Sequence, residues 1–315
     1  MASTARSLFA DIGTNSLRYL EVSRGPAEWI VHAGGKISLD GMGKGKIGEA
    51  LKQKLNPQGA VFDTIGASIW TSTIFVRRIT MPLMTPQELK GALAFEAEKH
   101  VPYPINECAM DSVIVRKMQG SKQMELMLIV AKKDLINERR LMMEEAGLGL
   151  GFVDIHPFAL ANAFAACAAP AAGQATTFLH IGDIEKFSFA GANFVSIMKD
   201  GQPQLVRDLG QETSPANEAK ISTEAMEKLS EKIKSSIEFY ENSAEEEINE
   251  VFIGGQGAYA DDALKFIEQS TEKKIKTFSF LDKVKFESKE AEETVRKQER
   301  EYLVCMGLAV RGLKS

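Results

Sequence analysis

The chain has 315 residues, of which 44% are apolar and 26% are charged, a composition typical of a globular protein with a large core and two lobes or domains. A formal net charge of −5 without any long Lys/Arg block argues against a nucleic-acid surface. Cys108, Cys167 and Cys305 form no C-x-x-C pair, which argues against a disulfide framework or a zinc site. No apolar stretch reaches the length of a membrane span, and the N-terminus lacks a signal-peptide core. We therefore expect a cytoplasmic protein whose membrane role, if any, comes through a partner.

The chain opens with an apolar run that ends in an Asp-Ile-Gly turn and continues as a second apolar run. Asp11 and Gly13 close the first run, and Thr14, Asn15 and Ser16 form the turn. Gly and Asn tolerate the positive φ that a tight hairpin requires. In such a hairpin the backbone N–H groups from Gly13 to Ser16 can face a phosphate, and Asp11 can hold a hydrated Mg²⁺. The alternative is an ordinary turn that Asp11 only caps.

The rest of residues 1–80 is predicted to complete a first lobe built mainly of strands. The glycine- and lysine-rich stretch Gly41–Gly48 predicts a loop, because it lacks the Gly-x4-Gly-Lys-Ser/Thr order of a P-loop. Apolar alternation predicts the other elements, which are a kinked strand at 29–39, a short helix at 47–55 and strands at 65–69 and 74–79.

Residues 81–150 are predicted to form a subdomain inserted in the first lobe. Thr85-Pro86-Gln87-Glu88 has the order of a capping box, and Pro102 and Pro104 force the helix to end near His100. Strands at 110–117 and 124–131 and a helix at 134–146 complete an α-β-β-α block. Its apolar residues fit either the core of the subdomain or a groove for an extended peptide; they are Met81, Leu83, Phe95, Val101, Tyr103 and Ile105.

The second half of the chain repeats the opening motif. Phe178-Leu-His-Ile-Gly182 matches Phe9-Ala-Asp-Ile-Gly13, and two further apolar runs follow each copy. A duplicated β-β-β unit predicts two lobes of the same design. We expect residues 151–173 to return to the first lobe and connect the lobes, residues 174–288 to form a reduced second lobe, and residues 289–315 to form a C-terminal helix.

Late in the second lobe, Gly254, Gly255 and Gly257 follow a predicted strand. Such a turn either approaches a ligand or simply joins the strand to the next helix. Before it, the polar stretch Gln211–Ser222 leads into a long predicted helix at about 223–242.

Together these motifs resemble the superfamily of actin, the heat-shock chaperone ATPases and the sugar kinases. The shared features are two β-β-β-α lobes that open with x-Ile-Gly and a late Ile-Gly-Gly turn. The passage from Glu96 to Ile105, with Ser236–Tyr240 and Met306–Leu313, narrows the resemblance to the PilM family, the FtsA-like component of type IV pilus assembly. The resemblance implies an α/β, actin-like bilobal fold with duplicated β-β-β-α units and the inserted α-β-β-α subdomain.

The resemblance also implies where ATP and Mg²⁺ would bind. In the superfamily two hairpins grip the phosphates and the late glycine turn approaches the adenosine. The positions of this sequence that match those elements are Asp11, Gly13, Thr14, Asn15, Ser16, Gly182, Gly254, Gly255 and Gly257, with Asp11 holding Mg²⁺ through water.

The second hairpin departs from the family pattern. His180 stands where the family has Asp, and Asp183 and Glu185 stand among positions that the family fills with small hydroxyl residues. Two carboxylates near a triphosphate repel it by on the order of several kcal/mol at intermediate dielectric. The interval from Leu209 to Thr223 is also short for the family's helical cover over the base. Changing the three hairpin residues to Asp, Ala and Thr is expected to raise ATP affinity about ten- to a hundredfold.

His180 itself fits two roles, a catalytic base or a hydrogen-bonded core residue, and we favour the core residue. No residue stands out as the group that accepts a proton from an attacking water, which actin-like hydrolysis requires.

Two functions stay open from the sequence. The favoured one is a scaffold of a type IV pilus or type II secretion-like machine, with degenerate or weak ATP binding or no cofactor. It would lie on the cytoplasmic face of the inner membrane and bind the cytoplasmic N-terminal tail of a PilN-like bitopic protein, with Phe95 and Tyr103 in the groove. The alternative is an actin-like ATPase that uses ATP and Mg²⁺ to switch partner binding or polymerisation. Self-association is compatible with both.

Overall fold

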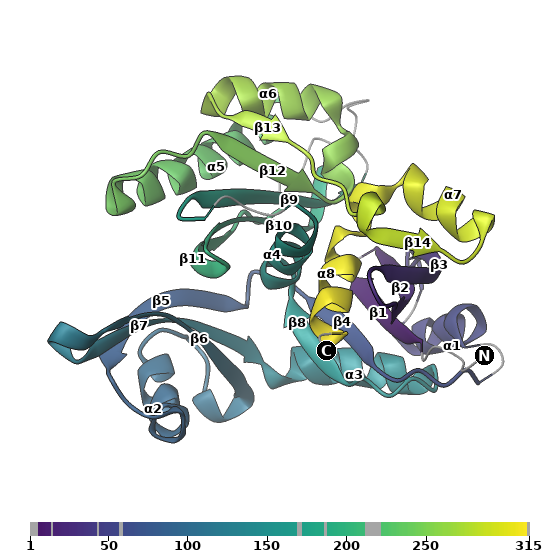
Figure 1. Ribbon diagram of the computed structural model, residues 1–315, viewed down its shortest axis with the longest axis horizontal. Helices are drawn as coiled ribbons and strands as arrows, with labels where there is room; N and C mark the ends of the chain where they lie inside the picture. Colours follow the sequence, from purple (N-terminus) through teal and green to yellow (C-terminus); the bar gives the residue numbers. More distant parts are fainter. Residues whose placement is uncertain are drawn as a thin grey trace.

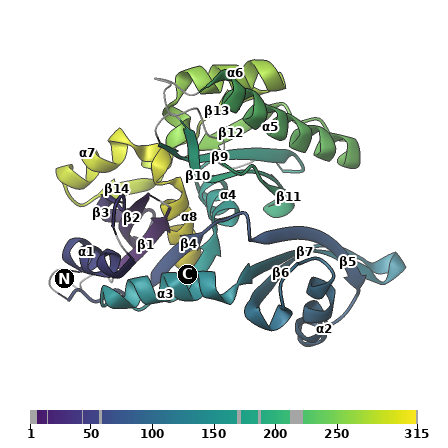
Figure 2. The same ribbon diagram turned by 180° about the vertical axis from the view of Figure 1, so that it is seen from behind.

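The computed structural model describes residues 6–13, 15–42, 44–56, 59–168, 172–185, 188–211 and 222–313. Strands in these ranges form three sheets, with helices packed on them and between them (Figure 1). A six-stranded sheet and a five-stranded sheet mark two lobes. The three-stranded sheet extends sideways from the first lobe and lies below the second lobe in both views (Figures 1 and 2).

The first sheet forms around a fully buried central strand. β1 (Ser7–Ile12) is buried at every position, as expected for an apolar run with neighbours on both sides. It pairs antiparallel with β2 and parallel with β4. The strand order is β14-β3-β2-β1-β4-β8, and the other strands are β2 (Ser16–Arg24), β3 (Trp29–Ser38), β4 (Ile65–Ile69), β8 (Phe152–Ile155) and β14 (Val284–Phe286).

The second sheet repeats this design. Its order, β11-β10-β9-β12-β13, corresponds strand by strand to β3-β2-β1-β4-β8 of the first sheet. In both sheets three antiparallel strands are followed by two parallel ones. The strands are β9 (Ala175–Glu185), β10 (Ser188–Lys199), β11 (Gln202–Asp208), β12 (Glu250–Gly254) and β13 (Lys274–Lys276). The predicted duplication is confirmed.

The inserted subdomain has one strand more than predicted. The sequence assigns residues 74–79 to the first lobe, but β5 (Phe75–Pro82) pairs along its length with β7 (Gln123–Lys132). β6 (Cys108–Met118) pairs with the other side of β7, and α2 (Pro86–Glu98) packs on this sheet through Leu89 and Leu93. Ile79 and Met81 of β5 share that core, which fixes the strand in the subdomain. The capping box of α2 is formed as predicted, and short 3₁₀ turns lie at Ile105–Glu107 and Gln119–Ser121.

A second correction concerns α3 (Lys133–Glu145), which was expected in the inserted subdomain. Met143, its buried residue, lies in one core with Leu51 and Leu55 of α1 (Lys44–Leu55) and with residues of β1. The chain therefore re-enters the first lobe directly after β7, earlier than residue 150, because Met143 packs in the core of that lobe and α3 lies beneath its sheet (Figure 1).

Two helices lie between the lobes. α4 (His156–Cys167) and α8 (Leu303–Gly312) cross in close contact (Figure 1). A Cβ at Gly307 of α8 would lie 1.7 Å from the Ala159 carbonyl oxygen of α4, so this crossing requires glycine. Phe9 of the first sheet and Phe178 of the second belong to the same core as both helices. The two lobes are thus joined through one hydrophobic core.

The last part of the chain also differs from the prediction. β14 pairs with β3, so the chain returns to the first lobe before residue 288. Two helices follow instead of one: α7 (Lys289–Lys297) and α8, separated by a 3₁₀ turn at Glu299–Glu301. The other helical segments are α5 (Thr223–Ala244), α6 (Asp261–Thr271) and 3₁₀ turns at Gln256–Tyr259 and Leu281–Lys283. Across the described ranges no helix is both long and apolar enough to cross a membrane.

Candidate functional site

Three polar side chains meet below the opening hairpin. Asp11 and Ser68 are register partners on the parallel strands β1 and β4, and His156 is the first residue of α4. The Ser68 hydroxyl donates to Asp11 Oδ1 at 2.8 Å, and His156 Nε2 lies 2.6 Å from the same oxygen. Burial alone raises the pKa of Asp11, but His156 and the charge of Arg18 hold it well below its usual range. Asp11 is therefore an ionised carboxylate, although it is only 3% exposed.

His180 completes this cluster from the second lobe. Its ring lies 5.8 Å from that of His156 and stacks on Phe194 at 5.1 Å, measured between ring centroids. Burial, with the charge of His156 as a second cause, lowers the pKa of His180 to about 3. His180 is thus a neutral, buried imidazole at neutral pH. Of the two roles considered from the sequence, the structure supports burial in the core, but His180 Nδ1 has no hydrogen-bond partner among the described residues.

A buried ion pair lies beside the cluster. Arg18 Nε of β2 donates to Glu301 Oε2 at 2.7 Å, and Lys36 Nζ donates to the same oxygen at 2.9 Å. Arg18 and Glu301 are both almost fully buried. The Cys305 thiol donates to the Arg18 carbonyl at 3.4 Å, and burial raises its pKa well above the ordinary value. Cys305 is therefore a structural thiol and not a reactive one.

Asp11, Ser68 and His156 have the residue types of a hydrolytic triad but not its geometry. In a triad the imidazole contacts serine through one nitrogen and the carboxylate through the other. Here a single atom, His156 Nε2, approaches both Ser68 Oγ (2.8 Å) and Asp11 Oδ1, while His156 Nδ1 is buried without a hydrogen-bond partner among the described residues. Ser68 is fully buried, so its hydroxyl is closed to a substrate. The described residues also hold no group of three or more His, Cys, Asp or Glu side chains suited to a metal ion.

The first hairpin does not fit a magnesium nucleotide in this arrangement. The Gly13 N–H donates to the Ser16 carbonyl at 3.0 Å and closes the turn, and the Asn15 carbonyl accepts from Leu39 N–H at 2.8 Å. Asp11, the expected carboxylate for Mg²⁺, points inward to His156 and Ser68. Two of the groups expected to face phosphate and metal are therefore used within the fold. Thr14 lies outside the described residues.

The second hairpin is likewise closed by its own side chains. The Gly182 N–H donates to Asn193 Oδ1 at 3.1 Å, and Asn193 Nδ2 donates to the Gly210 carbonyl at 2.8 Å. Gly182 thus has no backbone donor left for a phosphate. The side chains of Asp183 and Glu185 and the stretch 212–221 lie outside the described part of the chain.

The late glycine turn is explained by packing against β9. Gly255 has φ +84°, and a Cβ there would lie 2.2 Å from the Ile181 carbonyl oxygen. A Cβ at Gly257 would lie 2.3 Å from Ile181 Cβ, and one at Gly254 would touch Leu303 at 3.2 Å. Gly255 and Gly257 must be glycine so that the segment after β12 can approach β9, whereas a Cβ at Gly254 would need only a small shift of Leu303. A nucleotide is not needed to account for them.

The predicted peptide groove is not formed as one surface. Met81 and Val101 are buried in the core of the inserted subdomain, and Tyr103 and Ile105 pack against that core. The Tyr103 ring contacts Phe75 edge to face, and Lys132 Nζ lies over it at 4.0 Å. These four residues hold α2 and the strands together. By contrast, Leu83 and Phe95 are exposed, Phe95 by 75%.

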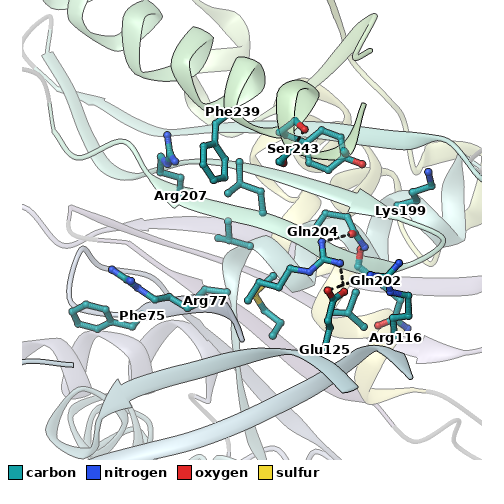
Figure 3. Close-up of a pocket in the computed structure, with 18 of the residues that line it drawn as sticks. Phe75, Arg77, Arg116, Glu125, Lys199, Gln202, Gln204, Arg207, Phe239 and Ser243 are labelled. Atoms are coloured by element: carbon teal, nitrogen blue, oxygen red, sulfur yellow. Dashed lines mark hydrogen bonds and ion pairs between the residues drawn. The ribbon is translucent and has the colours of Figure 1, made fainter. Parts of the chain in front are cut away.

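An open cleft of about 1100 Å³ lies instead between the inserted subdomain and the second lobe. β5, β6 and β7 form one wall, and β11 with the end of α5 forms the other (Figure 3). At its centre Arg78 contacts Glu125 and donates to Gln204 Oε1 at 3.1 Å, while Arg116 donates to Glu125 at 3.2 Å. The residues that build this cleft come from distant segments, so sequence reasoning missed it.

Sequence reasoning also missed Ser68 and His156. Each left a weak signal: Ser68 is a polar residue inside an apolar strand, and His156 directly precedes a proline at a helix start. The sequence does not show that these residues lie near Asp11. Their proximity follows from the folded structure, in which β4 pairs with β1 and Ser68 lies beside Asp11.

Comparison with known protein families identifies the family of this chain. The family model for the type IV pilus assembly protein PilM matches residues 10–210 and 211–313. The chain belongs to the PilM family. This family membership agrees with the resemblance inferred from the Glu96–Ile105 passage.

One solved structure shares the fold closely, and two others are more distantly similar. A structure described as a PilM–PilN type IV pilus biogenesis complex aligns with 99% of this chain and 100% of its own, at 18% identity and a TM-score of 0.77. The cytoplasmic domain of EpsL, an inner membrane component of the type II secretion system of Vibrio cholerae, aligns with 80% of this chain and 82% of its own, at 10% identity and a TM-score of 0.49. The ethanolamine utilization protein EutJ from Carboxydothermus hydrogenoformans covers 97% and 89%, at 11% identity and 0.47. This PilM-family chain has the actin-like, bilobal α/β fold.

Proposed function

We propose that this PilM-family chain is a scaffold that binds the cytoplasmic N-terminal tail of a PilN-like bitopic inner-membrane protein. Its membership in a type IV pilus assembly family, and its likeness in fold to a chain of a PilM–PilN complex, support this proposal. The chain then lies at the inner membrane through that partner.

The burial of Asp11 is the observation that favours a scaffold over an ATPase. This carboxylate is the expected partner of Mg²⁺, yet it is ionised, buried and bonded to Ser68 and His156. Freeing it would remove the acceptor of the buried His156–Ser68 pair, which leaves one donor of that pair unsatisfied and costs about 1–3 kcal/mol. ATP binding is therefore weak or absent.

Calorimetry with ATP and Mg²⁺ tests this part of the proposal. We expect a dissociation constant weaker than about 1 mM, because binding must first break the cluster. The control is ATP without Mg²⁺, which reveals any binding that does not involve the metal. Saturable binding in the micromolar range would contradict a scaffold with degenerate binding and support a nucleotide switch.

Phe95 is our candidate contact for the tail. It is a large apolar side chain on the outer side of α2, and exposed aromatic residues of this kind are common binding anchors. Tyr103 packs against the core of the subdomain, so its replacement by alanine would change stability as well as any affinity for the tail. Phe95→Ala isolates the binding contribution.

For Phe95→Ala we expect the affinity for a peptide of the PilN-like N-terminal tail to fall at least about fivefold. The free energy of unfolding should change by less than about 0.5 kcal/mol, because the side chain is exposed. Leu141→Ala is the matched control, since Leu141 is an exposed apolar residue on α3. Anisotropy with a labelled tail peptide measures both variants. Equal affinity of Phe95→Ala and wild type would remove Phe95 from the binding surface.

A further inference from the structure

The cleft between the inserted subdomain and the second lobe is bounded by two edge strands. β5 is the last strand of the inserted sheet, and β11 is the last strand of the second sheet. Both strands line the cleft and lie next to each other in both views (Figures 1 and 2). Edge strands carry main-chain N–H and C=O groups without a strand partner on one side. An extended segment is the kind of ligand that satisfies such groups.

In one part of the cleft the cationic side chains have carboxylate partners within the cleft. Arg78 and Arg116 share the Glu125 carboxylate, and Lys199 Nζ donates to Glu246 at 2.8 Å. Burial raises the pKa of Glu125, but the hydrogen bond and charge of Arg78, with the charge of Arg116, keep it below its ordinary value. Glu125 is therefore charged at neutral pH and neutralises one of its two arginines.

The other part of the cleft carries cations without carboxylate partners. Arg77 of β5 has no ion pair among the described residues, and Arg207 of β11 contacts only the Ser236 hydroxyl (3.4 Å) and the face of Phe239 (5.3 Å to the centroid). Figure 3 shows Arg77 and Arg207 on opposite walls at the same side of the cleft. A local excess of positive charge is notable in a chain whose formal net charge is −5. Arginine pairs of this kind match carboxylates, which they bind through two parallel hydrogen bonds.

Two aromatic rings lie beside these arginines. Phe75 comes from the wall of β5, and Phe239, 56% exposed, comes from α5 (Figure 3). Two further carboxylates line the cleft and accept from neutral donors, which leave their charge in place: Asp208 accepts from Trp70 Nε1 at 3.1 Å, and Asp200 accepts from Gly173 N–H at 2.7 Å. Among the described residues neither forms an ion pair with Arg77 or Arg207. Apolar surface next to unpaired guanidinium groups suits a segment that alternates acidic and apolar residues.

We propose that this cleft binds an acidic, extended segment of a partner protein. The carboxylates of the segment contact Arg77 and Arg207, and an apolar side chain rests between Phe75 and Phe239. This surface is distinct from Phe95 on α2, so the proposal goes beyond tail binding and does not depend on it. The chain then has two docking surfaces, one for the membrane tail and one for an acidic partner.

A peptide array tests the proposal with the full chain. The array consists of labelled peptides of about ten residues in which Glu or Asp alternates with each apolar residue, and in a parallel set Lys replaces the acidic residue. We expect saturable binding of acidic peptides and none of the lysine set. R77E with R207E should weaken binding at least about tenfold, since each reversed surface charge contributes on the order of 1 kcal/mol.

The matched control is K90E with K265E, which changes net charge equally at exposed sites on α2 and α6, outside the cleft. It should leave acidic-peptide binding within about twofold, and so should Phe95→Ala. If the charge reversal lowers stability, R77Q with R207Q serves as a second variant. It removes the two positive charges without adding negative ones and should also weaken binding of the acidic peptides. The proposal is overturned if no acidic peptide binds, if both arginine variants bind like wild type, or if the tail peptide of the PilN-like protein displaces the acidic peptide.

Discussion

This chain has two regions where its parts meet, one between the two lobes and one between the inserted subdomain and the second lobe. The first is closed by side chains, and the second is an open cleft. Between the two lobes, Asp11, Ser68, His156 and His180 form a buried polar cluster inside the shared core of α4 and α8. Between the inserted subdomain and the second lobe, a cleft of about 1100 Å³ stays open and is lined by charged side chains. Side chains fill the first space, where the resemblance to the actin superfamily led us to expect a nucleotide. The difference supports our proposal that this chain acts by binding partner proteins.

The same contrast decides which ion pairs matter for stability. Arg18–Glu301 is almost fully buried, whereas the Arg78–Glu125–Arg116 group lies in the open cleft. Removing one member of a buried pair leaves a desolvated charge, whereas water solvates a charge left in an open cleft. Stability should therefore respond strongly to changes at the first site and weakly at the second.

The largest expected effect is that of Glu301→Gln. Arg18 and Lys36 both donate to this carboxylate, and the amide cannot replace its charge. We expect the free energy of unfolding to fall by about 3–5 kcal/mol. Urea unfolding followed by circular dichroism measures the change.

The control for Glu301→Gln is Glu144→Gln. Glu144 pairs with Arg140 one helical turn away on α3, and both side chains are 46% exposed. The control should cost less than about 0.5 kcal/mol. If the two variants lose similar amounts of stability, burial does not make the Arg18–Glu301 pair more important for stability than an exposed pair.

The next effect is the pH dependence that His180 imposes. Its pKa is about 3 in the folded chain against an ordinary value of 6.5, so between these values the unfolded chain binds more protons. Stability is therefore full above about pH 6.5 and falls on acidification, by roughly 2 kcal/mol at pH 5. The charge of Asp11 opposes this shift and those of His156 and Arg18 support it. Asp11 itself contributes little in this window, because its pKa is lowered from 3.8 and its share of stability is lost only at more acidic pH.

His180→Leu isolates this effect. The leucine cannot take up a proton, so the difference in unfolding free energy between pH 7 and pH 5 should shrink by roughly 2 kcal/mol. Urea unfolding at both pH values measures it. An unchanged difference would mean that another group carries the pH dependence and that His180 is not held neutral by burial.

The sequence was sufficient to predict the duplicated lobes, the capping box of α2 and the family. Local sequence patterns predict these features. Examples are the matching Phe9–Gly13 and Phe178–Gly182 stretches and the order Thr85-Pro-Gln-Glu. The boundaries of the inserted subdomain were wrong because tertiary packing sets them. Nothing local in β5 shows that it pairs with β7, and nothing local in α3 shows that it packs on α1.

The candidate site was predicted less well, for a related reason. Asp11 was singled out as a residue for Mg²⁺, a role that stays a prediction. Its partners Ser68 and His156 are 57 and 145 residues away, and only tertiary structure brings the three together. The structure also changes our expectation for the repaired second hairpin. An aspartate at position 180 would place a second buried carboxylate near Asp11, where like charges repel and lower stability, so the gain in ATP affinity is no longer expected.

The smallest expected effect on stability, and the sharpest test of the open cleft, is that of Glu125→Gln. The substitution removes the carboxylate that Arg78 and Arg116 share. Both arginines are exposed enough for water to solvate them, so unfolding free energy should change by less than about 1 kcal/mol. The cleft gains one unit of uncompensated positive charge, and an acidic array peptide should bind about two- to fivefold more tightly.

Salt and a distant variant separate this effect from a general change in charge. High salt should erase the gain, because the interaction lies in an open, solvated cleft where screening is effective. Glu292→Gln on α7 is the matched control: it removes the partner of Arg296 and changes net charge equally, but far from the cleft (Figure 1). Anisotropy titrations at low and high salt measure both variants. If Glu125→Gln costs several kcal/mol of stability, or binds acidic peptides no better than Glu292→Gln, then the cleft behaves like the closed space between the lobes and the contrast between the two fails.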